Sequence, residues 1–306
     1  MEISTPSLSS TFVRDLYARM LLTRMVDQCA CRLHEEGQND FIATCRGHEA
    51  AQVGSAVCIE VGKDFTLPYY RDLGVVLTIG MTPYEVLRTY TQALHRAQTG
   101  EEHTSEHHKD AHFKNNPAIH HWGYHKHNIV TGPAPVATQV LHAAGIAFAC
   151  KLRKAPVVTV AYCGDGAAGE PDFLEGITFA AHHQLPAIFV YEQDDETSSS
   201  LQTLPLPNGL EHHCIDGTDV ITVYTIMRAA MQHAREGHGP VLLEMKVHHP
   251  PPGALAVNET YQDDSLHICQ QYLQERGMWD GEWAAQLRTR FKGEIELAMQ
   301  DALRDI

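Results

Sequence analysis

Two continuous apolar runs and a third predicted strand, separated by amphipathic segments, constrain the fold of this chain more than any other feature. The runs are "PVVTVAYCG" and "PAIFVYEQ", at residues 156–164 and 186–193, and the third strand is "PVLLEMKVHH", at 240–249. Such runs are typical of strands that are buried on both faces of a parallel sheet. The segments between them, 170–184 and 219–237, have helical periodicity. Strand, helix, strand, helix, strand predicts an α/β fold with a central parallel sheet flanked by helices.

The remainder of the chain is expected to be mostly helical. Apolar positions at helical spacing predict helices over 10–36, 47–62, 82–97, 136–153 and 267–305. The third of these begins with Thr82 as the cap and Pro83 in the first turn. The fourth is rich in small residues, which favours close packing against another helix or subunit.

Two segments do not have the helical pattern. Residues 64–74, "DFTLPYYRDLG", are expected to form a strand or an extended turn. Residues 101–128 contain eight histidines and little apolar periodicity, which predicts a histidine-rich loop. We expect one domain over residues 1–306, because the chain has no internal repeat and no long linker.

Composition excludes several classes of protein. The hydrophobic content of 43% and the charged content of 20% are those of an ordinary globular protein. A formal charge of −15 argues against non-specific nucleic-acid binding. No apolar run approaches the ~18 residues of a membrane helix, and the N-terminus lacks a signal-peptide core. We therefore expect a cytoplasmic protein without nucleic-acid or membrane partners, whose eight cysteines, with no CxxC among them, are reduced.

Acidic turns follow two of the predicted strands. "GDG" at 164–166 follows the first strand, and "EQDD" at 192–195 follows the second. Ligands of open parallel sheets lie beyond the carboxyl ends of the strands, so Asp165 and Asp194 should face one crevice. Glycines at such a turn allow close backbone approach to a phosphate, and two carboxylates can hold Mg²⁺. By itself "GDG" could be only a strand-to-helix turn; the second acidic turn favours a cofactor site.

Several longer motifs resemble one family. They are "MLLTRMVDQ", "GHEAAQVG", "PYYRDLG", "HHWGYHKHNIVTGPAPVATQ", "GDGAAGEPDFLEGITFAA", "GPVLLEMK" and "YLQERGMWD". In this order they resemble the α subunit (E1α) of the thiamine-diphosphate-dependent 2-oxo acid dehydrogenases, of the pyruvate and branched-chain complexes. The resemblance covers residues 10–306. It implies a thiamine-diphosphate-binding fold with a helical C-terminal segment.

The resemblance implies a set of cofactor-binding residues. They are Tyr70, Arg71, Val136, Gly164, Asp165, Gly166, Ala167, Asp194 and His249. Arg71 would contact the diphosphate, since its planar fork meets phosphate oxygens bidentately. The backbone at Gly166 and Ala167 would add N–H donors, and Val136 would lie against the thiamine rings.

The resemblance also implies metal ions. Asp165, Asp194 and the main-chain carbonyl of Glu196 would bind Mg²⁺. The family has a pair of asparagines where this chain has Gln193 and Asp194, and aspartate retains an oxygen ligand. A structural K⁺, held by some family members, would lie near Pro133, Pro135, Thr138 and Gln139.

Histidines are the candidate catalytic residues, and here the chain departs from the family. Aligned without a gap, His249 replaces a phosphate-facing arginine and Gly253 replaces the active-site histidine; with a four-residue gap, His249 is that histidine itself. In the phosphate-facing role its charge would make cofactor affinity fall from pH 6 to 8. His121 matches another family histidine near the active site. His108 and His112 could share a metal only if their segment were helical.

The function implied by the resemblance requires a partner. In the family, thiamine diphosphate supplies the carbanion chemistry that removes CO₂ from a 2-oxo acid, and the acyl unit passes to a lipoyl-bearing acyltransferase. A β subunit supplies the rest of the site, which predicts an α₂β₂ heterotetramer. The loop after Asp194 is shorter than in the family, which leaves two alternatives open. One is non-oxidative decarboxylation or carboligation, and the other is a catalytically degenerate E1α-like binding subunit.

Overall fold

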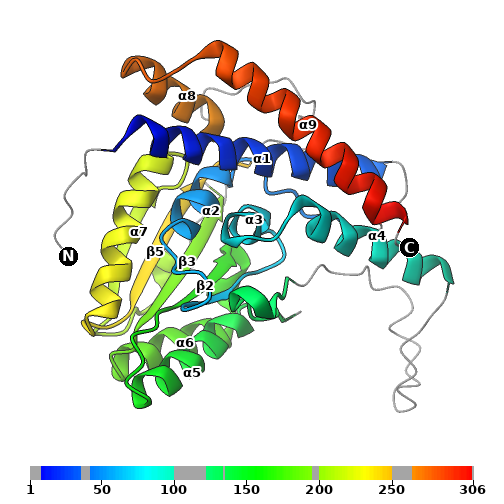
Figure 1. Cartoon of the computed structure of the whole chain (residues 1–306). Helices are drawn as coiled ribbons and strands as arrows, with labels where there is room; N and C mark the ends of the chain where they lie inside the picture. Colours follow the sequence, from blue (N-terminus) through cyan, green and yellow to red (C-terminus); the bar gives the residue numbers. More distant parts are fainter. Residues whose placement is uncertain are drawn as a thin grey trace.

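A five-stranded sheet forms the centre of the protein. The computed structural model describes residues 8–35, 42–99, 122–133, 135–194, 200–249 and 264–304. The strands are β1 Phe65–Leu67, β2 Thr159–Gly164, β3 Ala187–Asp194, β4 Glu211–Asp216 and β5 Val241–Val247. They lie in the order β1-β2-β3-β5-β4 and every pairing is parallel (Figure 1). The predicted α/β fold with a parallel sheet is confirmed.

Two helices cover one face of the sheet, α5 (Thr138–Leu152) and α6 (Pro171–His182) (Figure 1). They pack closely because the residues between them are small. A Cβ atom on Gly176 would lie 2.9 Å from Cγ1 of Val140. The alanines of α5 that point into the core are Ala143, Ala144 and Ala147. The predicted close packing of this small-residue helix is confirmed.

The opposite face is covered by α2 (Glu49–Ala56), α3 (Leu73–Ile79) and α7 (Val220–Arg235) (Figure 1). An outer layer adds α1 (Ser10–Glu35), α4 (Pro83–Thr99), α8 (Ser265–Glu275) and α9 (Gly281–Arg304). Short 3₁₀ helices span His125–His127, Asp165–Gly169 (η3) and Ser200–Thr203.

Helix α4 begins as the sequence predicts. The backbone N–H of Glu85 donates to Oγ1 of Thr82 over 3.2 Å, and the carboxylate of Glu85 accepts from the N–H of Thr82 over 2.8 Å. This reciprocal pair is a capping box, which satisfies two backbone donors that the helix leaves free.

One expectation about local structure was wrong, and two elements were not predicted. The helix predicted over 47–62 ends at Ala56 and is followed by turns. Residues 64–74 contain strand β1 and a turn, as expected, but helix α3, which begins at Leu73, was not predicted because its β-branched composition resembles a strand. Strand β4 was not predicted, because its sequence, "EHHCID", alternates in exposure at the edge of the sheet and has no apolar run.

The histidine-rich segment is only partly described. Its last residues form an antiparallel bridge between Tyr124 and Ile129, and Ile129 also bridges Thr66 beside β1. The rest of the predicted loop, including His108 and His112, lies outside the described residues.

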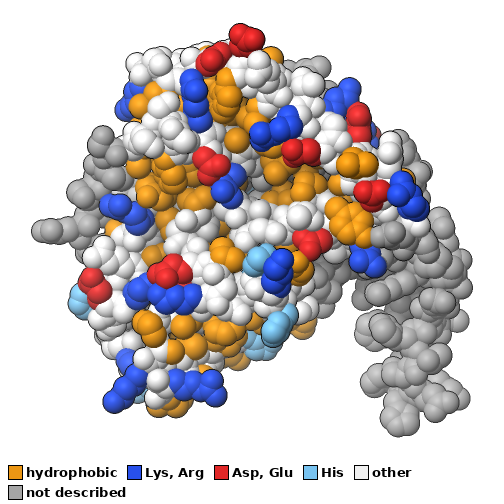
Figure 2. Space-filling model, viewed as in Figure 1, with side chains coloured by type: hydrophobic (Ala, Val, Ile, Leu, Met, Phe, Trp, Pro, Cys, Tyr) orange, Lys and Arg blue, Asp and Glu red, His pale blue; other side chains and the backbone are white. Residues whose placement is uncertain are grey.

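The surface and the thiols agree with the composition. Acidic, basic and hydrophobic side chains are interspersed over the face in Figure 2, and hydrophobic side chains also lie along its lower part, over α5 and α6. The exposed large hydrophobic side chains on these two helices are Leu141, Leu152 and Phe179.

The eight cysteines are free thiols, as predicted. Within the described parts of the chain, no helix is both long and apolar enough to cross a membrane.

Candidate functional site

The predicted site residues follow four strands at one edge of the sheet. Arg71 follows β1, Asp165 follows β2, Asp194 ends β3, and His249 lies two residues beyond β5. The register pairs Gly164 with Glu192 and Asp194 with Val247, so the turns after β2 and β3 are neighbours, as expected. Helices α6 and α7 lie on opposite faces of the sheet (Figure 1), and ligands of open sheets bind where the chain changes faces in this way.

The turn after β2 is open to solvent on one side. Asp165 and Gly166 are exposed, and the N–H of Gly166 donates to Oδ1 of Asp165 over 2.9 Å. A Cβ atom on Gly164 would lie 3.3 Å from the ring of Tyr69, whereas one on Gly166 would meet nothing within 4 Å. The glycine at 164 therefore allows the strand to pass close to Tyr69, and Gly166 borders open space.

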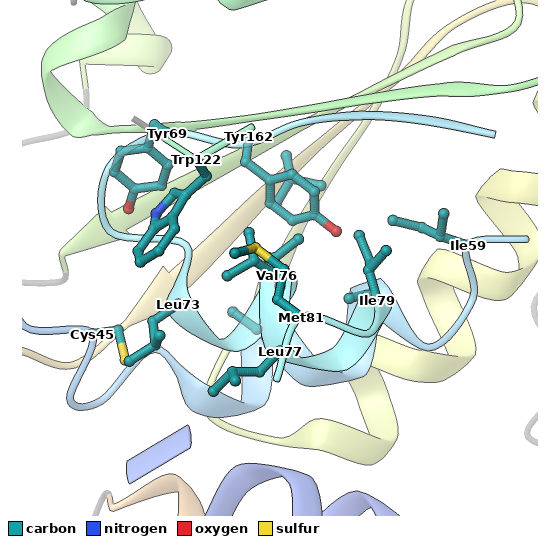
Figure 3. Close-up of a cluster of buried hydrophobic side chains, with 14 of the residues drawn as sticks. Cys45, Ile59, Tyr69, Leu73, Val76, Leu77, Ile79, Met81, Trp122 and Tyr162 are labelled. Atoms are coloured by element: carbon teal, nitrogen blue, oxygen red, sulfur yellow. The ribbon is translucent and has the colours of Figure 1, made fainter. Parts of the chain in front are cut away.

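Arg71 is fixed in a short turn between β1 and α3. Its Nη1 donates to the carbonyl of Thr44 over 2.5 Å, and Nε1 of Trp122 donates to the carbonyl of Tyr70 over 3.1 Å. Burial acts to lower the pKa of Arg71, but the neighbouring Tyr69, Tyr70 and Glu192 raise it, so the guanidinium stays charged. Figure 3 shows Tyr69 and Trp122 together above the apolar side chains of α3.

A buried polar cluster behind this edge was not predicted. Oε2 of Glu192 is hydrogen-bonded to Nδ1 of His48 (2.7 Å), the hydroxyl of Tyr69 (2.9 Å) and Nε2 of Gln52 (3.2 Å). Asp72 is also fully buried and accepts the N–H of Tyr69 over 2.8 Å. Burial, and then the charge of Glu192, raise the pKa of Asp72 well above its usual value. We refer to His48, Gln52, Tyr69, Asp72 and Glu192 as the Glu192 cluster.

Sequence reasoning missed this cluster because its members are far apart in the chain and form no local pattern. One signal was available. Glu192 continues the apolar run "AIFVYE", which was read as a strand buried on both faces. A carboxylate in such a strand must find hydrogen-bond donors, so it could have been flagged as a buried polar residue.

His249 is partly buried beside this cluster. Its ring lies 5.8 Å from that of His48, edge to face, and its Nδ1 is buried with no partner among the described residues. Burial, followed by the charges of Arg71 and His48, lowers the pKa of His249 to about 4. The nearby charge of Asp194 acts in the opposite direction. An uncharged His249 does not support the expectation that its charge changes cofactor affinity between pH 6 and 8.

The predicted Mg²⁺ site is described only in part. Asp165 is exposed and Asp194 is partly buried at the ends of adjacent strands. Glu196, the proposed main-chain ligand, and His121, the second catalytic candidate, lie outside the described residues. The described residues contain no group of three or more histidine, cysteine or acidic side chains that could hold a metal. The Mg²⁺ ligands and the K⁺ residues remain predictions.

Comparison with known proteins gives the family. The family model described as "Dehydrogenase E1 component" matches residues 17–250. The chain belongs to this E1 family. It is 33% identical to the 2-oxoisovalerate dehydrogenase subunit alpha of Bacillus subtilis (strain 168), over 88% of this chain and 83% of the relative.

Two further E1 relatives extend the match over almost the whole chain. Identity is 30% with the 3-methyl-2-oxobutanoate dehydrogenase subunit alpha of Mycobacterium tuberculosis (strain CDC 1551 / Oshkosh), over 98% of this chain and 83% of the relative. It is 28% with the pyruvate dehydrogenase E1 component subunit alpha of Bacillus subtilis, over 98% and 80%. The resemblance to E1 α subunits is thus confirmed.

Membership of the E1 family implies dependence on thiamine diphosphate, and the residues present fit that group. A charged guanidinium at Arg71 and the open space beside Gly166 suit a diphosphate. Tyr70 (38% exposed) and Val136 (49% exposed) offer apolar surface to the rings. The candidate residues therefore include both polar and apolar groups.

Proposed function

We propose that this chain is the α subunit of a thiamine-diphosphate-dependent 2-oxo acid dehydrogenase, active with a β subunit. The observation that carries the proposal is the convergence of Arg71, Asp165, Asp194 and His249 at one edge of the sheet in a chain of the E1 family. The function is to remove CO₂ from a 2-oxo acid and to pass the acyl unit to a lipoyl acceptor.

Different residues have different roles in binding the cofactor. Arg71 would bind the diphosphate, while Asp165 and Asp194, with the carbonyl of Glu196, would hold Mg²⁺. His249 is a neutral hydrogen-bonding group near neutral pH, because its pKa is about 4. It can therefore accept or donate a hydrogen bond at the site without adding a positive charge.

The partner follows from the relatives. Those named above are alpha subunits of dehydrogenases, which supports a complex with a β subunit, as an α₂β₂ heterotetramer, and with a lipoyl-bearing acyltransferase. The apolar side chains exposed on α5 and α6 are compatible with a subunit contact there. Nothing in the comparisons favours the carboligase or degenerate alternatives.

A branched-chain 2-oxo acid is the first substrate to test. The two relatives with 33% and 30% identity carry names for one compound, since 2-oxoisovalerate is 3-methyl-2-oxobutanoate, whereas identity to the pyruvate enzyme is 28%. Pyruvate is the natural comparison.

The test uses the co-purified α and β subunits. Calorimetry should show Mg²⁺-dependent binding of thiamine diphosphate, and CO₂ should be released with a lipoyl acceptor present, while the chain without β does not turn over. Asp165→Ala should abolish Mg²⁺-dependent binding, because it removes an anionic ligand that faces the diphosphate. Asp194→Asn should be tolerated, because it restores the amide of the family. Unchanged affinity in Asp165→Ala would overturn the site assignment.

A further inference from the structure

Two segments that carry candidate cofactor residues, β3 and the turn of Arg71, meet the start of α2 at one buried side chain. Glu192 lies two residues before Asp194 in β3, and its side chain is inaccessible to solvent. Its Oε2 is bonded to Tyr69, in the turn that contains Arg71, and to His48 and Gln52 at the start of α2. A single carboxylate oxygen thus links β3, α2 and the turn between β1 and α3.

His48 extends this link to the segment that follows β5. Gly47 has a φ of +92°, and a Cβ atom there would lie 1.8 Å from the carbonyl oxygen of His248. Only glycine allows so close an approach, so residues 47 and 48 are seated against the segment that follows β5. The ring of His48 then meets that of His249 while Nδ1 is bonded to Glu192.

Gln52 links the cluster to the backbone of the Arg71 turn. Its Nε2 donates to the carbonyl of Arg71 over 3.1 Å as well as to Glu192, and its Oε1 accepts from the N–H of Gly74 over 2.9 Å. Because both ends of the amide are used and the residue is fully buried, a shift of Glu192 would be transmitted to the turn.

We propose that Glu192 is a positioning residue for the cofactor edge, which fixes the turn of Arg71 and the ring of His48 relative to β3. The inference rests on the proposed function, since the cofactor is what Arg71 would hold. Glu192 itself does not touch the diphosphate; it acts by accepting three hydrogen bonds at one oxygen. A glutamine at this position keeps the shape and one acceptor oxygen but removes the negative charge, so all three hydrogen bonds lose their charge-assisted strength.

The chain provides a matched control. Glu244, in the neighbouring strand β5, is also buried, and its Oε2 is bonded to Nε2 of His212 over 3.0 Å. It is another strand glutamate paired with a histidine, and this bond leads to the edge strand β4, on the other side of β5 from β3. Glu192→Gln and Glu244→Gln therefore differ mainly in the link to the site.

The first measurement needs no cofactor. In the cofactor-free αβ complex, amide hydrogen exchange of peptides covering 69–74 should be about tenfold faster in Glu192→Gln than in the wild type, because the turn opens locally. Exchange in these peptides should be unchanged in Glu244→Gln. Equal protection of the turn in all three proteins would overturn the proposal.

The second measurement is the affinity for thiamine diphosphate by calorimetry. Glu192→Gln should weaken binding about tenfold, the effect of one hydrogen bond to a charged group. In an Arg71→Ala background the same substitution should cost about twofold or less, since coupled residues are not additive. Full additivity would mean that Glu192 does not act through Arg71, and would overturn the proposal.

If Glu192→Gln does not fold, Tyr69→Phe tests the same link by removing only the hydroxyl that donates to Glu192. It should speed exchange in the turn and weaken cofactor binding in the same direction by a smaller factor; normal exchange and affinity would contradict the proposal. If the wild-type complex fails to bind thiamine diphosphate, the proposed function fails, while the exchange experiment still decides the role of Glu192.

Discussion

Two consecutive residues at the start of α2 join two different buried polar clusters. Glu49 is bonded to Arg24 of α1 and accepts the hydroxyl of Ser265 over 3.0 Å. Arg24 also pairs with Asp264, at 2.9 Å. We refer to Arg24, Glu49, Asp264 and Ser265 as the Arg24 cluster. His48, one residue earlier, belongs to the Glu192 cluster at the edge of the sheet.

The two clusters differ in how their charges are balanced. In the Arg24 cluster one guanidinium lies between two carboxylates, and although burial acts to raise the pKa of Asp264, Arg24 outweighs it and lowers the value. In the Glu192 cluster, two buried carboxylates lie near one another, and the pKa of Asp72 is raised. The first arrangement favours the charged form of Asp264, and the second disfavours the charged form of Asp72.

This difference assigns the Arg24 cluster to the stability of the fold and the Glu192 cluster to the candidate site. The Arg24 cluster joins α1, α2 and α8 and contains none of the candidate cofactor residues. The Glu192 cluster lies beneath those strand ends and retains an unfavourable pair of carboxylates. Buried groups of like charge are typical of functional sites, where the local arrangement is not the most stable one.

The largest expected effect comes from breaking the Arg24 cluster. Arg24→Met should lower the free energy of unfolding by about 3–5 kcal/mol, because it leaves two buried carboxylates without their cation. Urea unfolding of the purified chain measures this. The control is Lys63→Met, which breaks the exposed pair with Glu60 and should cost less than about 1 kcal/mol. Similar losses in both variants would contradict the comparison.

The sequence predicted the fold where local pattern and tertiary structure agree. Helix α1 and the buried strands β2, β3 and β5 follow from periodicity or from apolar residues, and the start of α4 follows from Thr82 as the cap and Pro83 in the first turn. It failed at α3, where a short segment rich in valine and leucine is helical because of its packing rather than its propensity. Edge strand β4 likewise has no apolar run to identify it.

The site was predictable only at the ends of strands. Motifs placed Arg71, Asp165, Asp194 and His249 at one edge, since the carboxyl ends of parallel strands share that edge. The contacts behind them were not predictable, because His48 and Glu192 are separated by 144 residues and no pattern joins them. The charge of His249 was not predictable either, since it depends on burial and on the neighbours that the fold provides.

The next largest effect is expected at Arg71, in the candidate site. Arg71→Ala should weaken thiamine diphosphate binding to the αβ complex by about 1.5–3 kcal/mol, the range for a hydrogen bond to a charged group. Arg71→Lys should recover only part, because an ammonium cannot reproduce the fork. Calorimetry of the three complexes decides, and equal affinities would place Arg71 outside the site.

The smallest effect concerns the proton on His249. Its pKa is about 4 in the folded chain, below the ordinary 6.5, because burial and then Arg71 and His48 disfavour the charged ring. The unfolded chain therefore binds this proton more readily, so the stability provided by a neutral His249 is complete above about pH 6.5 and is lost as the pH falls towards 4. One proton limits the slope to about 1.4 kcal/mol per pH unit, and partial exposure of the ring makes it smaller.

In urea unfolding of the isolated chain, His249→Gln should lose less stability than the wild type between pH 7 and pH 5. Above pH 7 the free energies of unfolding of the two proteins should change in parallel. Lys63→Met, which breaks an exposed pair without a histidine, should retain the wild-type slope over the same range. Identical pH profiles for wild type and His249→Gln would show that the ring is as easily protonated in the folded chain as in the unfolded one, and would return His249 to the role of a charged, phosphate-facing group.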